Sequence, residues 1–141
     1  DVLRTPRDPA ALARDIVAMR QRMHDGPANR SGLFDVKHDR GGMVDIEFIV
    51  QDLVLGASHA HPALTRNAGN IALLALSADL GLVAAARAAA VADAYREYRR
   101  VQHARRMAGA TEVRVDPAPH AARRAEVLAL WQDVFGAARG A

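Results

Sequence analysis

Hydrophobic residues recur every three to four positions along most of this chain, which is the spacing of an α-helix that buries one face. The pattern is densest in residues 43–58, where a turn of about 100° per residue places the apolar side chains on two separate faces. Two polar stripes divide these faces, one with Asp45 and Asp52 and the other with Glu47 and Gln51. A helix that covers one side of a core needs one apolar stripe. Because residues 43–58 carry two apolar faces, they predict a central helix packed on both flanks, with its polar residues in the seams between neighbouring helices.

Four further segments repeat the helical spacing. Asp8 followed by Pro9 predicts the start of the first, because an acidic cap and a proline at the first helical position are common there. Gly81 is placed to end the third helix in a left-handed conformation. We expect an all-α fold, a bundle of about five antiparallel helices with a buried central helix starting near Met43. The expected helices span residues 9–24, 43–58, 67–80, 82–107 and 121–138.

Each flanking helix has an expected inner face. Arg14, Arg20 and Arg22 are placed on the outer side of the first helix. The inward residues are Leu12, Ile16, Met19 and Met23, then Ile71, Leu74, Ala75 and Ala78, then Val91, Tyr95, Tyr98 and Val101, and finally Val127, Leu128, Trp131, Val134 and Phe135.

The run from Phe34 to Lys37 has the pattern of a short extended segment. Two arrangements fit this run. It pairs with a strand partner, such as a sheet edge in a neighbouring domain, or it is a simple loop packed on the bundle. Residues 109–119, bounded by glycine and two prolines, are expected to form a loop.

The length of 141 residues fits one domain, and half of the residues are hydrophobic. The chain has no cysteine, which excludes a disulfide scaffold and a thiolate zinc site and suits a cytoplasmic protein. No stretch is long and apolar enough to cross a membrane. The chain begins with Asp1 rather than Met, so we expect it to be a piece of something longer.

The formal net charge is +3, and nearly all positive charge is arginine, since Lys37 is the one lysine. A high-GC genome also produces a bias toward arginine and alanine. We therefore do not infer nucleic-acid binding from the positive charge, and no nucleic-acid partner is expected. Arginines cluster in the second half of the fourth expected helix, at Arg96, Arg99 and Arg100. This face is either solvated, with part of its charge complementing the helix dipole, or it meets an acidic partner or nucleotide phosphates.

Two glycines, Gly41-Gly42, stand directly before the central helix. Glycine permits positive φ and close backbone approach, and a helix N-terminus offers free N–H groups and partial positive charge. With Lys37 and Arg40 nearby, the segment is a candidate anion site. The alternative is that Asp45, in the first turn, caps its own helix. Asp45 and Glu47 lie roughly 160° apart on the wheel, so they are poor candidates to chelate a metal ion together, and no metal site is expected.

The same stretch resembles the signature of a known family. The likeness lies in Phe34-Asp35-Val36-Lys37, Gly41-Gly42, Asp45-Ile46-Glu47-Phe48-Ile49 and Gln51, and it extends from Pro6-Arg7-Asp8 to Leu130-Trp131. These residues look like glutamine synthetase adenylyltransferase, the bifunctional enzyme that adds AMP to glutamine synthetase and removes it. The Asp-Ile-Glu-Phe form resembles the C-terminal, transferase half.

The resemblance implies a helical domain that follows a nucleotidyltransferase domain of polymerase-β-like fold in a larger, multidomain enzyme. That upstream domain would hold ATP and Mg²⁺ through a Gly-Ser segment and paired aspartates. Nothing in this chain matches that pattern, so we expect no catalytic residue and no bound cofactor here, and no AMP transfer by this chain alone. The implied partners of the whole enzyme are glutamine synthetase and PII-type signalling proteins.

Two roles follow for the candidate residues. In the first, Lys37, Arg40, Gly41 and Gly42 face the nucleotide or the catalytic domain, and Asp45 and Glu47 orient their loop. In the second, the chain is a pure interaction module, and the arginine face with Arg96, Arg99 and Arg100 docks an acidic partner or a regulatory protein.

Overall fold

The computed structural model describes residues 9–24, 32–57 and 69–139 of the chain. In these ranges five α-helices account for most of the fold, together with two short strands and one 3-10 turn, η3 (Ala118–His120). The helices are α1 (Pro9–His24), α2 (Met43–Ala57), α3 (Asn70–Asp79), α4 (Ala85–Met107) and α5 (Ala121–Arg139). The all-α prediction is confirmed. The expected cap at Asp8 and the expected helix start at Asn67 lie outside the described residues.

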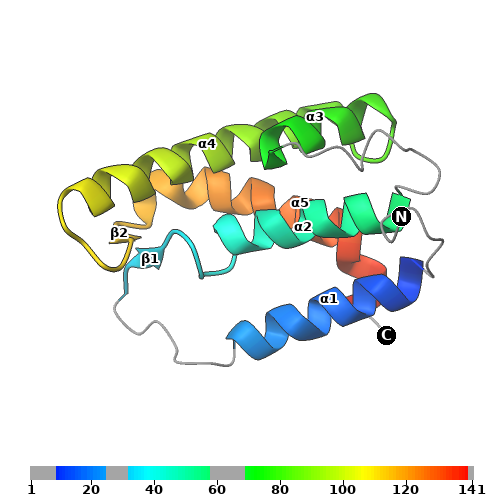
Figure 1. Cartoon of the computed structure of the whole chain (residues 1–141), viewed down its shortest axis with the longest axis horizontal. Coiled ribbons are helices and arrows are strands. Elements are labelled where there is room, and N and C mark those ends of the chain that lie inside the picture. Colours follow the sequence, from blue (N-terminus) through cyan, green and yellow to red (C-terminus); the bar gives the residue numbers. More distant parts are fainter. Residues whose placement is uncertain (1–8, 25–31, 58–68, 140–141) are drawn as a thin grey trace.

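The central position of α2 is also confirmed, since it packs against α1, α3, α4 and α5. Figure 1 shows α2 running through the middle of the bundle, with α1 below it and the α3–α4 pair above it. Ile46 and Ile49 are completely buried in the core. Only one of the two polar stripes lies in a seam, because Asp45 is buried and Asp52 is partly buried, whereas Glu47 and Gln51 are exposed.

The extended run finds its strand partner within this chain. The strand β1 (Phe34–Asp35) pairs antiparallel with β2 (Arg114–Val115), with Phe34 opposite Val115. One further hydrogen bond runs from the Val36 N–H to the Val113 carbonyl at 2.9 Å. A strand partner is therefore confirmed, and it lies within this chain. The alternative of a simple loop is wrong, and so is the expectation that 109–119 is only a loop. Two-residue strands are too short to leave a periodic signal.

The inner face of α1 differs from the expected one. Met19 is 42% exposed, whereas Arg20, which we placed on the outer side, is 1% exposed. The buried stripe of α1 contains Leu12, Ile16 and Arg20, which are spaced four residues apart. Arg20 can lie inside because it meets a buried carboxylate, and a paired charge is the usual condition for burying arginine.

The helices α3 and α5 need smaller corrections. In α3, Leu73 and Ser77 are buried with Leu74, whereas Ala75 is exposed. Burial of the Ser77 hydroxyl is tolerated because it donates to the Leu73 carbonyl at 2.8 Å. Gly81 ends α3 with a φ of 76°, as expected. In α5 the core residues are Val127, Leu130, Trp131 and Phe135, with Leu128 and Val134 partly buried.

Candidate functional site

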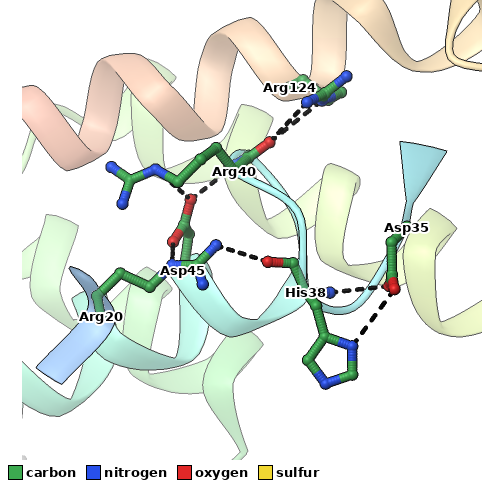
Figure 2. Close-up of polar contacts among 7 residues, drawn as sticks. Arg20, Asp35, His38, Arg40, Asp45 and Arg124 are labelled. Carbon is green, nitrogen blue, oxygen red and sulfur yellow. Dashed lines mark hydrogen bonds and ion pairs between the residues drawn. The ribbon is translucent and has the colours of Figure 1, made fainter. Parts of the chain in front are cut away.

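The loop 36–42 joins β1 to α2 and contains Lys37, Arg40, Gly41 and Gly42, which the sequence singled out. Figure 2 shows how Asp45, in the first turn of α2, lies beneath this loop between Arg20 and Arg40. The Asp45 side chain is completely buried. One carboxylate oxygen, Oδ1, accepts a hydrogen bond from Nε of Arg20. The other, Oδ2, accepts one from the Gly41 N–H at 2.7 Å and lies 3.7 Å from Nε of Arg40. Asp45 therefore binds the loop to α1. The Met43 and Val44 N–H groups donate to loop carbonyls and not to Asp45, so the expected cap is present only as a favourable negative charge in the first turn of α2.

The backbone carbonyls of the loop are held by side chains from three different helices. Nη2 of Arg20, on α1, donates to the His38 carbonyl at 2.7 Å. Arg124, on α5, donates to the Arg40 carbonyl through Nε at 3.2 Å and Nη2 at 3.0 Å, as Figure 2 shows. The Tyr98 hydroxyl, on α4, donates to the Gly41 carbonyl at 2.9 Å. Burial raises the pKa of Tyr98 above its usual range, so its phenol keeps the proton that it donates.

The two glycines are required by close contacts within the chain. Gly41 has a φ of 83°, and a Cβ at this position would lie 3.0 Å from Cβ of Arg124. A Cβ on Gly42 would lie 2.5 Å from the Val36 carbonyl oxygen, which real Cβ atoms essentially never approach so closely. The first N–H groups of α2 are also in use, because Met43 donates to the Val36 carbonyl and Val44 to the Lys37 carbonyl. These contacts favour the structural explanation of the glycine pair over an anion site formed by its backbone.

Lys37 and His38 follow β1 at the start of the loop. The Asp35 carboxylate shapes this turn, since its Oδ1 accepts from the N–H groups of both residues at 3.0 Å. The His38 ring is 61% exposed, and its Nδ1 lies 3.5 Å from Oδ2 of Asp35. Lys37 is partly buried, and Arg40 lies with its guanidinium 4.6 Å from the centre of the Trp131 ring. The structure thus brings Lys37, Arg40, Gly41, Gly42 and Asp45 together.

Glu47 stands apart from this group. It is exposed, and it makes no hydrogen bond or ion pair with the residues that the structure describes. We expected both Asp45 and Glu47 to orient the loop. Among the described residues, Asp45 contacts the loop and Glu47 does not. The sequence reasoning missed Arg20, Tyr98 and Arg124 as the residues that fix the loop. A signal for Arg20 was present, because it continues the four-residue spacing of Leu12 and Ile16.

The arginines of α4 form a second, separate surface. Arg96 and Arg100 are exposed and each pairs with a carboxylate one turn earlier, Asp93 and Glu97 respectively. The hydrogen bond from Arg100 holds the pKa of Glu97 below its usual range. The guanidinium of Arg99 lies 5.9 Å from the centre of the Tyr95 ring. An open groove of about 500 Å³ runs along this surface of α4. It is lined by Arg96, Arg99, Arg100, Gln102, His103 and Arg106.

Across the described parts of the chain, no three His, Asp or Glu side chains gather in a way that would hold a metal ion. Among the described helices, none has the length and apolar character needed to span a bilayer.

Comparisons with known proteins agree with the motif. A family model, GlnD PII-uridylyltransferase, matches residues 11–113. The chain is 51% identical over 138 residues to the bifunctional glutamine synthetase adenylyltransferase/adenylyl-removing enzyme of Aromatoleum aromaticum, which covers 98% of this chain and 15% of that enzyme. It is 52% identical over 135 residues to the enzyme of the same name from Bordetella bronchiseptica, and 56% identical over 135 residues to that from Ralstonia nicotianae. Those two matches each cover 96% of this chain and 14% of the relative.

The chain therefore spans about one seventh of the length of the curated relatives it matches. The region that the family model matches contains the loop 36–42, Asp45 and all of α4. The chain belongs to the family that the GlnD PII-uridylyltransferase model describes, and its homologues at about 50% identity are bifunctional glutamine synthetase adenylyltransferases.

Proposed function

We propose that this chain is a helical domain of an enzyme that transfers AMP from ATP to a tyrosine of glutamine synthetase and also removes it. The observation that carries this proposal is identity of about 50% over nearly the whole chain to enzymes that bear this activity in their names. In such an enzyme the ATP and Mg²⁺ are held by an upstream nucleotidyltransferase domain, and PII-type proteins control the reaction in the cytoplasm. The Asp-Ile-Glu-Phe sequence at 45–48 favours the C-terminal, transferase half.

The role of this domain is to present the loop 36–42 as one wall of the catalytic cleft. The loop suits that role because its carbonyls at His38, Arg40 and Gly41 are held by α1, α5 and α4. A surface that must position a nucleotide or a neighbouring domain works best when it is fixed before the partner arrives. His38 is exposed and Lys37 is partly exposed, so their side chains are the ones that we expect a partner to meet. The domain supplies no catalytic group and is inactive alone.

The test is Lys37→Ala in the full-length enzyme that carries this segment. The Lys37 side chain makes no hydrogen bond or ion pair with the described residues, so its removal should leave the melting temperature unchanged. A lost charge-assisted contact is worth about 1.5–3 kcal/mol, so the rate of AMP transfer should fall roughly 10- to 100-fold. Arg22→Ala on the exposed side of α1 is the matched control, with activity expected to stay at the parent level. Undiminished transfer by the Lys37 variant would remove the cleft-wall role.

A second candidate is a pure protein-interaction module. It is favoured by the exposed arginine groove on α4, which lies apart from the loop. The cleft-wall role and the interaction module predict different effects of a loop substitution on AMP transfer. In an interaction module, Lys37→Ala has no effect on transfer, whereas charge reversal on α4 weakens binding of the partner.

A further inference from the structure

The charges that line the α4 groove are not all balanced by residues that the structure describes. Asp93 and Glu97 lie within 2.6 Å or less of Arg96 and Arg100. Arg99 and Arg106 have no carboxylate partner among the described residues. They are seven residues apart, so they lie about 10 Å apart along the helix axis and on one side of it. The groove thus presents two guanidinium groups without a carboxylate partner among the described residues, and two that are each hydrogen-bonded to a carboxylate one turn earlier.

The helix dipole explains only part of this arrangement. Arg105 and Arg106 are in the last turn of α4, where positive charge is favourable. Arg99 lies two turns earlier, beyond the range of that effect. In the turn that contains Arg99, the side facing the core is filled by Tyr98, which is buried and donates to the Gly41 carbonyl. Arg99 is next to Tyr98 in sequence, yet it faces solvent, so its position is not required for packing.

The shape and composition of the groove narrow the class of ligand. All of its lining residues come from α4, so no second element closes over it, whereas pockets for nucleotides bury most of the ligand. The Phe, Tyr and Trp side chains all lie in the described ranges, and none is exposed for stacking on bases. A carboxylate-rich protein surface fits best, because arginine pairs carboxylates in a bidentate manner and is enriched at protein interfaces.

We propose that the α4 groove docks an acidic surface of glutamine synthetase, with Arg99 and Arg106 as the main contacts. This inference rests on the proposed function for the identity of the partner. Arg96 and Arg100 contribute by exchanging Asp93 and Glu97 for carboxylates of the partner. Both arginines are exposed, and ion pairs at the protein surface typically contribute about 0–1 kcal/mol, so the exchange costs little. Docking on this face leaves the loop 36–42, on the inner side of α4, free to meet the catalytic domain.

The experiment is calorimetric titration of this chain into purified glutamine synthetase, at ionic strengths of about 50 mM and about 200 mM. The test variant carries Arg99→Glu and Arg106→Glu, and the control carries Arg14→Glu and Arg22→Glu on the exposed side of α1. Both variants change the net charge equally. We expect the parent to bind, with weaker binding at the higher salt, and the α4 variant to bind at least about tenfold more weakly while the control stays within about threefold of the parent.

A neutral pair, Arg99→Gln with Arg106→Gln, separates loss of contact from damage to α4, because it adds no negative charge near the helix C-terminus. It should retain the parent's melting temperature and still bind several-fold more weakly. Equal weakening by the α4 and α1 variants would overturn the groove proposal and leave the proposed function intact, since the partner still binds. Absence of binding by the parent, or binding to a PII-type protein or duplex DNA instead, would overturn glutamine synthetase as the occupant. Loss of AMP transfer by Lys37→Ala in the longer enzyme would then still support the proposed function.

Discussion

Asn in place of Asp45 tests the central contact of the loop, because it removes a negative charge from a site where two arginines converge. Asp45 is completely buried and Arg20 is 1% exposed, so Arg20 would be left in the core without a counter-charge. Asn keeps one oxygen, which can accept from Arg20 or from the Gly41 N–H but not from both in the present geometry. Removal of one partner of a buried ion pair typically costs about 3–5 kcal/mol. In a domain of this length that lowers the melting temperature by roughly 10–15 °C.

The assay is thermal and urea unfolding followed by circular dichroism at the helix band. Glu47→Gln is the matched control, since it removes the same charge two residues away on the same helix from an exposed side chain, and it should change stability by less than about 0.5 kcal/mol. Arg20→Met combined with Asp45→Asn should cost less than the sum of the single changes, because no unpaired charge is then buried. A cost below about 1 kcal/mol for Asp45→Asn, or simple additivity with Arg20→Met, would refute the buried ion pair as the fixing contact.

Two further predictions concern neighbouring positions. Gly42→Ala should destabilise the fold by at least about 2 kcal/mol in urea unfolding, because its Cβ would meet the Val36 carbonyl oxygen at 2.5 Å. Gly69→Ala, where the added Cβ meets nothing within 4 Å, is the comparison, and equal effects at the two glycines would contradict the steric argument. Burial raises the pKa of Asp52 from 3.8 to about 6, so between these values the folded chain binds a proton that the unfolded chain has released. Stability should therefore fall as pH rises from about 4 to 6. Asp52→Asn should remove that slope and be more stable than the parent above pH 7, and identical pH profiles for the two proteins in thermal unfolding would rule out this titration.

The sequence predicted the helices well because each depends on local periodicity. Residues 43–57 carry apolar side chains on two faces, and the structure places helices on both sides of them. The stop at Gly81 was predictable for the same reason, since a left-handed residue after a helix requires no distant partner.

What the sequence did not predict depends on contacts between distant segments. Arg20 and Asp45 are 25 residues apart, and Tyr98 and Gly41 are 57 residues apart. Charged side chains are rarely buried unless paired, so Arg20 was placed outside as long as its partner was unknown. The pairing of β1 with β2 was not predicted for the same reason. Two-residue strands are stabilised by pairing with each other and carry no recognisable pattern of their own.

The way the loop 36–42 uses its backbone limits how it can act on a partner. The carbonyls of His38, Arg40 and Gly41 and the N–H groups of Gly41, Met43 and Val44 all have partners inside the chain. Recognition by this loop must therefore come from side chains. Substitutions at the glycines or at Asp45 should act by destabilising the fold, and those at exposed side chains should act by removing contacts. Melting temperature measured beside activity separates the two classes. A glycine variant that kept its melting temperature but lost AMP transfer would show that the backbone contributes directly to the site.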